Sequence, residues 1–597
     1  MPTASRASST AASGSRLTGA REALRAWTWP RTGLAVVLAA SFGLAILWLA
    51  RFRFGYGTDW DESGYMARGL NDAHALVAGG PLKLLWEYEK QGVEAPLVSL
   101  MDVPINAVFG LGVFQSLLLM PILAVLLGLA TFALARQVVS ESWALLATLV
   151  VAAMPVVSDY SREFVFAVPA ALFFTATLWA LLRSDRLRRP RWVWAASVFV
   201  GFMLLSRTMT VSFLPAIALV ALGQLFAIRE ERRQRALRLL AGAGIATFVA
   251  ASWFLHNWRG VLDYLRSTGY GSAKGQYGEA YPVLSWNFWS KELGLILNQT
   301  YLPLGAALAA CFLAALAVLL VRRRRRPGAV LRLDMLGGPV FALTVSVGEG
   351  YLALTSSTNE GTAFALPFLP ALVILAVVAV ARLRARPLQV ALASALALVS
   401  IGNLVMKSGS GGPLATVRST SVPSLGTVSV TDGRGLTQLY AFQSGYPVPS
   451  PDTPLPALHR LWLPFDREMT GWMTGYAKKH DERAYVLTAT SHQYTNQTWI
   501  SLADALWYHA NVFALWIGPG IPGETVAQYR AALASHPANF VEITSSDGPV
   551  RPQEFDHTRV EAAATSLGFR KVKTFRMPDG SLLWLWWKPV ALQRLPA

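Results

Sequence analysis

Residues 57–65 read Gly-Thr-Asp-Trp-Asp-Glu-Ser-Gly-Tyr, and they follow the first long apolar run of the chain, residues 33–50, after only six residues. Three carboxylates, Asp59, Asp61 and Glu62, therefore lie within four positions beside a hydrocarbon-compatible segment. A carboxylate near hydrocarbon is costly unless it is paired, hydrated or used in chemistry. A hydrated loop would account for these acids, but the stretch is also the first candidate for a functional site.

The composition indicates a polytopic membrane protein. The chain has 597 residues, of which 53% are hydrophobic and 15% are charged, with a mean hydropathy of +0.39, which excludes a purely soluble protein. The net charge of +18 comes mostly from basic blocks between apolar segments, a pattern typical of membrane topology, so we expect no nucleic-acid partner. The single cysteine, Cys311, lies in an apolar run and excludes a disulfide framework.

The apolar runs predict about eleven transmembrane helices after a disordered cytosolic tail at residues 1–32. The tail is rich in Ser, Ala, Thr and Arg and has no apolar run of signal-peptide length before residue 33. The predicted helices form a transmembrane module at 33–406 and cover residues 33–50, 111–135, 142–158, 164–182, 192–206, 208–227, 239–256, 301–321, 337–354, 362–381 and 388–406.

The distribution of arginine predicts the orientation. With the N-terminus in the cytoplasm, the inner loops 183–191, 229–238, 322–332 and 382–386 hold five, five, six and three arginines. The outer connections at 159–163, 207 and 355–361 hold one, one and none. Because cytoplasmic loops carry the excess of basic residues, this asymmetry places the acidic stretch and the C-terminal region outside the cytoplasm. The predicted location is a bacterial cell inner membrane, crossed several times.

Two regions outside the predicted spans, the first outer loop and the C-terminal region, have patterns that predict their own secondary structure. The first outer loop, 51–110, contains an apolar segment at 97–110 that is too short to span and predicts an interfacial or re-entrant helix. Residues 407–597 alternate strand-like and helix-like runs and predict an extracytoplasmic α/β domain. Its expected strands are 485–490, 511–517, 540–544, 569–576 and 582–587, and its expected helices are 465–479, 523–535 and 557–567.

Short motifs in a fixed order connect these regions to a known superfamily. The chain shows Asp61-Glu62-Ser63-Gly64-Tyr65, then Glu94-Ala95-Pro96-Leu97, Phe109-Gly110, Tyr160-Ser161-Arg162-Glu163 and Leu366-Pro367-Phe368-Leu369-Pro370. Over residues 33–406 this order resembles the GT-C superfamily of membrane glycosyltransferases, in particular the branch containing protein O-mannosyltransferases and the lipid A aminoarabinose transferase. The chain departs from that branch at Ala95, where many relatives have Lys, and it lacks the Asp that usually follows the second-loop Arg-Glu; Asp159 or Glu163 could substitute.

The resemblance implies a glycosyltransferase that moves a sugar from a polyprenyl-phosphate donor to a hydroxyl of a glycan, lipid or protein acceptor in the periplasm or cell wall. Such an enzyme must deprotonate or orient the acceptor hydroxyl and stabilise the departing phosphate. We expect Asp61 to be the general base and Glu62 to assist it, with Mg²⁺ or Mn²⁺ as a candidate cofactor held by Asp61 and Glu163. The expected substrate-binding residues are Asp59, Tyr65, Glu94, Asp159, Arg162, Glu163, Arg207, His256, Arg259 and Glu360.

Other readings of these residues stay open. Arg207 could be an interfacial anchor, His256 an interfacial hydrogen-bonding residue and Glu360 a solvated loop acid. At the level of the whole chain, a transporter or flippase of a lipid-linked glycan and a non-catalytic glycan-binding scaffold are the alternatives. Transporters usually place ionisable groups near the bilayer midplane, whereas here they are predicted at outer helix ends, which favours an enzyme.

Overall fold

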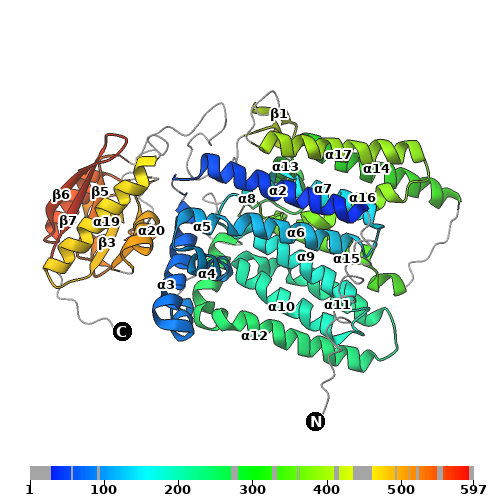
Figure 1. The fold of residues 1–597 in the computed structure, drawn as a ribbon, viewed down its shortest axis with the longest axis horizontal. Coiled ribbons are helices and arrows are strands. Elements are labelled where there is room, and N and C mark those ends of the chain that lie inside the picture. The colour runs from blue at the N-terminus through cyan, green and yellow to red at the C-terminus, as the bar shows by residue number, and fades with distance from the viewer. Residues whose placement is uncertain are drawn as a thin grey trace, which may run out of the picture.

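The computed structural model describes residues 29–55, 58, 60–89, 94–269, 280–325, 333–359, 361, 363–408, 416–433, 460–490, 492, 494–509, 511–518, 524–546 and 555–589. Most helices of the N-terminal module run side by side in one bundle (Figure 1). Helix α3 (Trp60–Glu89) stands across the ends of these helices, and the sheet domain lies on the other side of α3. The acidic stretch therefore lies between the bundle and the C-terminal domain.

Each of the eleven predicted apolar runs contains a helix. The long apolar helices are α2 (Trp29–Phe52), α5 (Val113–Leu117) with α6 (Leu119–Ala135), α7 (Glu141–Ala152), α9 (Ala167–Arg183), α10 (Pro190–Ser206), α11 (Leu214–Phe226), α12 (Arg232–Tyr264), α14 (Leu302–Arg325), α15 (Pro339–Ser356), α16 (Leu369–Ala381) and α17 (Arg386–Lys407). Short helical segments join them: α8 (Pro155–Tyr160), η1 (Thr208–Phe213), η2 (Leu265–Gly269), α13 (Trp286–Thr300) and η3 (Leu333–Gly337).

Fewer of the described helices are long enough to cross a membrane than the eleven predicted runs. Among the described residues, five helices are long and apolar enough to cross a bilayer, or six if α13 and the first part of α14, bent by 116°, form one span. Several others, such as α7, α9 and α10, have 10–17 residues, whereas a full crossing takes roughly 20. The structure thus confirms a helical membrane module, while eleven crossings stays a prediction.

The first outer loop is mostly helical. Helix α3 is interrupted at Gly80, whose φ of 72° lies in the left-handed region that glycine tolerates, and Pro81 follows. The predicted interfacial segment is α4 (Leu97–Phe109), which packs on α3. This close packing depends on Gly69, because a Cβ there would lie 2.8 Å from Oδ2 of Asp102. The long α3 was not predicted from the sequence.

Two of the basic loops, 183–191 and 229–238, lie at the end of the bundle away from α3. Arg207, just after α10, contacts Phe166, just before α9, so the 183–191 connection lies at the opposite end of these 17-residue helices, about 25 Å away. There the basic loops meet one another, with Arg235 donating to the carbonyl of Arg186 at 2.8 Å. Arginine-rich and acid-rich connections are therefore separated by the length of the bundle.

A hairpin of β1 (Arg418–Val422) and β2 (Gly426–Thr431) follows the last bundle helix. It packs on the bundle: the Asn298 side chain, from α13, donates to the carbonyl of Thr427 at 3.1 Å and accepts from the amide of Ser429 at 3.0 Å. The predicted domain boundary at 407 therefore precedes a segment that belongs structurally to the helical module. Within the described residues, the compact α/β domain spans 460–589.

The α/β domain is a five-stranded mixed sheet of order β4-β3-β5-β7-β6. Strands β4 (Val512–Trp516), β3 (Ala484–Ala489) and β5 (Phe540–Thr544) are parallel, while β7 (Leu582–Trp587) and β6 (Arg570–Arg576) are antiparallel additions. Its helices are α19 (Trp462–Lys479), α20 (Gln497–Trp507), α21 (Val526–Ala534) and α22 (His557–Ser566). The five predicted strands and three predicted helices are confirmed, and α20 is additional.

Alternation along the strands gives the sheet two cores. Val486 packs with α19 and α20, whereas its neighbour Leu487 packs with α21 and α22 on the other face. Helix α20 also contributes Leu502 and Ala505 to the core of the helical module, and it packs along α3. One hydrophobic core thus joins the domain to the acidic stretch.

Two carboxyl groups are buried in the α/β domain, Asp466 on α19 and Glu542 on β5. The Thr495 hydroxyl donates to Oε1 of Glu542 at 2.8 Å. Burial raises the pKa of Glu542 to about 7, and burial together with the charge of Glu542 raises the pKa of Asp466 well above its usual value. Both groups therefore bind protons more tightly in the folded domain than in the unfolded chain.

We predict that this domain loses stability as the pH rises from about 4.5 to 7, because the folded state then keeps protons that the unfolded state releases. Glu542→Gln removes one titrating group and should stabilise the domain at pH 8 by up to about 3 kcal/mol. Hydrogen exchange of strand 540–544, compared at pH 5 and pH 8 after correction for intrinsic rates, measures this. If the stability of the domain depends on pH equally in the wild type and in the double variant Asp466→Asn/Glu542→Gln, these two carboxyl groups do not cause the pH dependence and the prediction is wrong.

Candidate active site

Asp61 lies in the first turn of α3, at the mouth of the bundle, and its side chain is half-buried. It interacts electrostatically with Arg207 and with Tyr65, one turn further along α3. Beside it, Trp60 packs edge-on against Trp516 at the end of β4, with 5.6 Å between ring centroids. Asp61 is therefore a carboxylate held between the helical module and the C-terminal domain.

Glu62 has a different environment from its neighbour. Its side chain is fully buried, with Oε2 2.6 Å from Nη2 of Arg53 and Oε1 accepting from the backbone amide of Phe164 at 2.8 Å. Arg53 is also fully buried and donates to the carbonyl of Arg162 at 3.4 Å. Glu62 thus ties the end of α2 to the start of α3 and to the α8–α9 connection. A buried, paired carboxylate suits a residue that positions Asp61, and the predicted catalytic role of Glu62 stays a prediction.

Tyr65 lines the same region from α3. Its ring packs edge-on against Phe166, with 5.8 Å between centroids, and its carbonyl accepts from the Ser99 hydroxyl at 3.0 Å. Burial, with the negative charges of Glu94 and Asp61, raises the pKa of Tyr65 well above its usual value. The hydroxyl therefore stays protonated and can act as a hydrogen-bond donor.

Arg207 is a cation that interacts electrostatically with both Asp61 and Tyr65. Its guanidinium lies between two aromatic rings, 4.0 Å from the centroid of Phe166 and 3.4 Å from that of Phe364. Tyr160 and Tyr264 also interact with it electrostatically. Such stacking fixes the plane of a guanidinium while leaving its N–H donors at the edge. Arg207 is thus a donor group held in place by two aromatic rings.

Asp159 and Arg162 belong to a second, buried cluster. Nζ of Lys407, at the end of α17, lies 2.8 Å from Oδ1 of Asp159 and 5.3 Å from the ring centroid of Tyr301. The Arg162 guanidinium lies over Trp48 of α2 at 4.9 Å and interacts electrostatically with Asp159. The structure places both residues in this buried network, and their predicted contact with the substrate stays a prediction.

The remaining predicted residues are dispersed. Glu94 pairs with Arg68 of α3 at 2.6 Å, and Glu163 is fully buried in the α8–α9 connection. His256 and Arg259 are exposed on α12, where Arg259 lies over Trp258, so they are not drawn into the arrangement of Asp61 and Arg207. Asp59 and Glu360 lie outside the described residues.

The described residues do not form a complete metal site. Among them, no three His, Cys, Asp or Glu side chains converge in a way that could hold a metal ion. The predicted pair, Asp61 and Glu163, differs sharply in exposure, since Asp61 is half-buried and Glu163 is fully buried. Hard cations such as Mg²⁺ take several oxygen ligands, so this pair alone does not fit such an ion.

Two basic residues of the site were missed from the sequence, Arg53 and Lys407. Arg53 stands at the outer end of the first helix, where the positive-inside pattern predicts few cations. Lys407 ends the last apolar run at the same predicted face. A basic residue at the outer end of a predicted span was thus the signal in the sequence that could have indicated these two residues. The sequence did not indicate their partners, Glu62 and Asp159.

An apolar groove leads along the bundle towards Arg207. It has a volume of 700 Å³ and is lined by α9, α10, α11 and α12 with almost exclusively apolar side chains. At one end lie Leu204 and Val211, which flank Arg207 in the chain, together with Leu255 and Trp258 of α12. A linear apolar chain would fit such a groove.

Comparisons with known proteins agree with the resemblance found in the sequence. Residues 93–254 match the family of dolichyl-phosphate-mannose-protein mannosyltransferases. A comparison with the curated proteins finds no match.

Two solved structures extend over nearly the whole chain. ArnT from Cupriavidus metallidurans bound to undecaprenyl phosphate has a TM-score of 0.51 and 15% identity, covering 95% of this chain and 99% of its own. The oligosaccharyltransferase AglB from Archaeoglobus fulgidus, in complex with an inhibitory peptide and a dolichol-phosphate, has a TM-score of 0.52 and 13% identity. The match covers 95% of this chain and 75% of the AglB chain.

The fold therefore places this chain among the membrane proteins with the GT-C architecture. The resemblance to GT-C glycosyltransferases predicted from the Asp61-Glu62 stretch is confirmed by the family match and by the structural neighbours. Within that superfamily, the similarity extends to the mannosyltransferase family over 93–254 and to ArnT over almost the full length of both chains.

Proposed function

We propose that the protein is a glycosyltransferase that moves a sugar from a polyprenyl-phosphate donor to a hydroxyl of a periplasmic or cell-wall acceptor. The observation that carries this proposal is a half-buried carboxylate, Asp61, that interacts electrostatically with Arg207, a guanidinium held over two aromatic rings. The neighbours ArnT and AglB, solved with undecaprenyl phosphate and dolichol-phosphate, support the class of donor.

The reaction assigned to this site breaks the bond between the sugar and the lipid phosphate. Asp61 accepts the proton of the acceptor hydroxyl as its oxygen bonds to the anomeric carbon. The departing phosphate keeps the bonding electrons, and Arg207 stabilises the charge that develops on it. Tyr65, protonated and beside Asp61, donates a hydrogen bond to the sugar or phosphate. Glu62 and Arg53 act by holding Asp61 in place.

The groove of α9–α12 suits the apolar part of the donor. Its walls leave a polyprenyl chain in a hydrocarbon-like environment, while Leu204 and Val211 bring its end to Arg207. A lipid phosphate there would meet the N–H groups that stacking on Phe166 and Phe364 leaves accessible. No step of this mechanism passes through Mg²⁺ or Mn²⁺, since Asp61 and Glu163 alone do not make a suitable ligand set.

The proposed setting is a bacterial inner membrane, with the N-terminus in the cytoplasm and Asp61 and the C-terminal domain outside it. The separation of the basic loops from the acidic stretch by the length of the bundle supports this orientation. The acceptor is a glycan, lipid or protein that reaches the gap between α3 and the C-terminal domain.

The competing functions are a transporter of a lipid-linked glycan and a non-catalytic scaffold. Two buried charge pairs of the helical module, Lys407–Asp159 and Arg53–Glu62, have their charges matched, which suits a fixed framework better than a moving pathway. Asp61, by contrast, is half-buried beside Arg207. This division between a fixed buried layer and an accessible carboxylate favours an enzyme.

The test is sugar release by the purified full-length protein from radiolabelled decaprenyl-phosphate and undecaprenyl-phosphate sugars, with and without a cell-wall extract as acceptor source. An enzyme releases free polyprenyl phosphate faster when the extract is present, whereas a transporter or a scaffold leaves the donor intact. Adding EDTA in a parallel arm measures the requirement for a divalent cation. Intact donor in every arm would refute the proposed function.

Arg207→Lys should raise the KM for the lipid donor about tenfold or more while the protein stays folded. Lysine keeps the charge but loses the planar stacking between two rings and the fork of N–H donors, interactions of about 1–2 kcal/mol each. Arg259→Lys on the exposed face of α12 is the matched control and should leave the donor KM unchanged. If both variants bind donor equally well, Arg207 does not hold its phosphate.

A further inference from the structure

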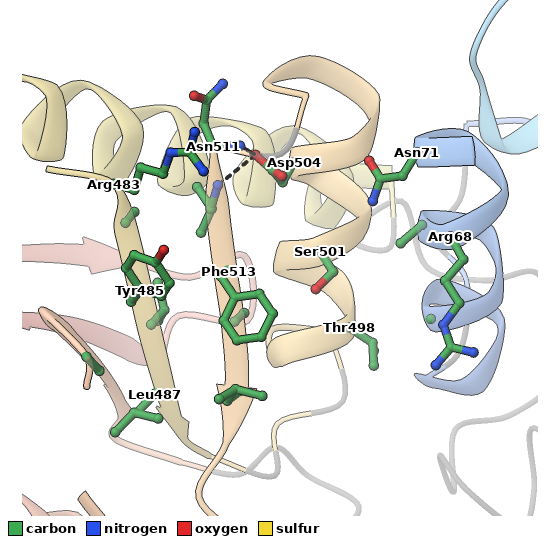
Figure 2. A pocket seen from close by; sticks show the side chains of 18 of the residues that line it. Arg68, Asn71, Arg483, Tyr485, Leu487, Thr498, Ser501, Asp504, Asn511 and Phe513 are labelled. Atoms are coloured by element: carbon green, nitrogen blue, oxygen red, sulfur yellow. Dashed lines mark hydrogen bonds between the residues drawn. The ribbon is translucent and has the colours of Figure 1, made fainter. Parts of the chain in front are cut away.

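A cavity of 900 Å³ lies between α3 and the C-terminal domain, and its chemistry indicates a ligand beyond the lipid donor. Figure 2 shows its walls: Arg68 and Asn71 project from α3, Thr498 and Ser501 from α20, and Tyr485 and Phe513 from adjacent strands. The volume falls in the upper part of the range of ligand sites, about 300–1,000 Å³. The cavity is thus large enough for an extended ligand of several rings.

Its floor is an uncovered part of the sheet. Helices α21 and α22 pack over β3 and β5 on this face, but they leave the end nearest β4 open. Tyr485 and Phe513 lie there side by side, with ring centroids 6.0 Å apart, and Phe513 is 55% exposed. Phe513 is exposed and Tyr485 is half-buried, so the two rings offer an aromatic surface that an apolar face of a ligand can cover.

The rim is polar but electrostatically satisfied. Arg68 pairs with Glu94 at 2.6 Å, and Asp504 accepts from the backbone amides of Asn511 and Val512 at 3.1 Å each (Figure 2). The acids among the lining residues, Asp72, Glu87, Glu94 and Asp504, outnumber the arginines, Arg68 and Arg483. This balance disfavours a phosphate or an acidic polymer, while the amides and hydroxyls of the rim can bond to neutral hydroxyl groups.

The α3 residues that line the cavity begin one turn after the proposed catalytic residue, Asp61. Asp61, Gly64 and Arg68 follow one another at helical spacing on one face of α3. Gly64 lies opposite the α/β domain, where a Cβ would sit 3.7 Å from Cγ2 of Thr498. A chain bound over Phe513 could therefore extend along α3 and present its end to Asp61.

We infer that this cavity binds the acceptor and that the acceptor is a neutral saccharide chain, one ring of which stacks on Tyr485 and Phe513 while its hydroxyls bond to the side chains of α3 and α20. A saccharide combines a flat C–H face with hydroxyl edges, which matches the aromatic floor and the satisfied polar rim. The term "acceptor" rests on the proposed function, whereas saccharide binding at this cavity does not.

The test uses the full-length protein in nanodiscs on an array of neutral hexose and pentose oligosaccharides, uronic-acid oligosaccharides and unmodified peptides. We expect binding to a subset of the neutral saccharides. Phe513→Ala and Phe513→Leu should each weaken it at least tenfold, since leucine keeps apolar bulk without the flat ring. Leu582→Ala, an exposed strand residue outside the cavity, is the matched control and should bind as the wild type does.

Binding only to uronic-acid oligosaccharides or to peptides, no binding to the array, or unchanged binding by both Phe513 variants would overturn the inference. Asp61→Asn should bind the neutral saccharide normally. Slow hydrolysis of the lipid donor by water, measured without acceptor, separates the two proposals: donor turnover without saccharide binding defeats only this inference, and saccharide binding without donor turnover defeats only the proposed function.

Discussion

Asp61→Asn is expected to lower kcat for sugar transfer by about 10²–10⁴-fold, the range over which a positioned general base contributes. Asparagine keeps the shape and can bond to the acceptor hydroxyl, but it cannot take its proton at neutral pH. Because Arg207 and the apolar groove are untouched, the KM for the lipid donor should change little. Initial rates with saturating donor and acceptor, together with donor binding measured separately, give both quantities.

The control for this variant is Asp263→Asn, which removes a carboxylate from the exposed face of α12. It should retain wild-type kinetics, so that a general effect of net charge is excluded. A well-folded Asp61→Asn protein that transfers sugar at the wild-type rate would show that another group, or no group, takes the proton.

Glu62→Ala is expected to destabilise the protein by about 3–5 kcal/mol, because it leaves the buried guanidinium of Arg53 without its carboxylate partner. The backbone amide of Phe164 would lose its acceptor at the same time. Thermal unfolding of the purified protein in detergent, followed by intrinsic fluorescence, measures the loss as a lower transition temperature.

The chain offers a matched control in Glu94→Ala. Glu94 also pairs with an arginine at 2.6 Å, but the Arg68 and Glu94 side chains are 26% and 42% exposed, against 0% for both partners of the buried pair. Removing half of an exposed pair should cost no more than about 1 kcal/mol. Similar losses in the two variants would mean that burial of Arg53 and Glu62 is not what stabilises the end of α2. Replacing both buried partners, as in Arg53→Met/Glu62→Met, should recover most of the stability.

Much of the fold follows from local patterns in the sequence. Apolar runs of membrane length predict the bundle helices, since a helix satisfies its own backbone groups in lipid. Strand-like runs that alternate with helix-like runs predict the five strands of the C-terminal sheet. The same patterns fail for α3 and α20, whose apolar residues face each other across the domain interface. Leu502 and Ala505 of α20 are buried in the core of the helical module, against which α20 packs along α3. No local pattern in the sequence indicates that α20 packs on α3.

The candidate site could be predicted only in part, because its contacts also join segments that are far apart in the chain. The Asp61-Glu62 motif marks the right place, but the roles of its two acids separate only in three dimensions, where Glu62 meets Arg53 and Asp61 faces Arg207. Lys407 and Asp159 are 248 positions apart in the chain, so their pairing depends on bundle packing. The aromatic pair Tyr485 and Phe513 lies on neighbouring parallel strands, whose register the sequence does not specify.

The most direct test of the central claim is one measurement on proteoliposomes that carry a radiolabelled polyprenyl-phosphate sugar in the leaflet on the side of the C-terminal domain, with a neutral saccharide acceptor on that same side. The account predicts glycosylated acceptor and free polyprenyl phosphate on that side, formed by the wild type and lost in Asp61→Asn. Intact lipid-linked sugar appearing in the opposite leaflet, with no glycosylated acceptor, would contradict the account and identify a transporter.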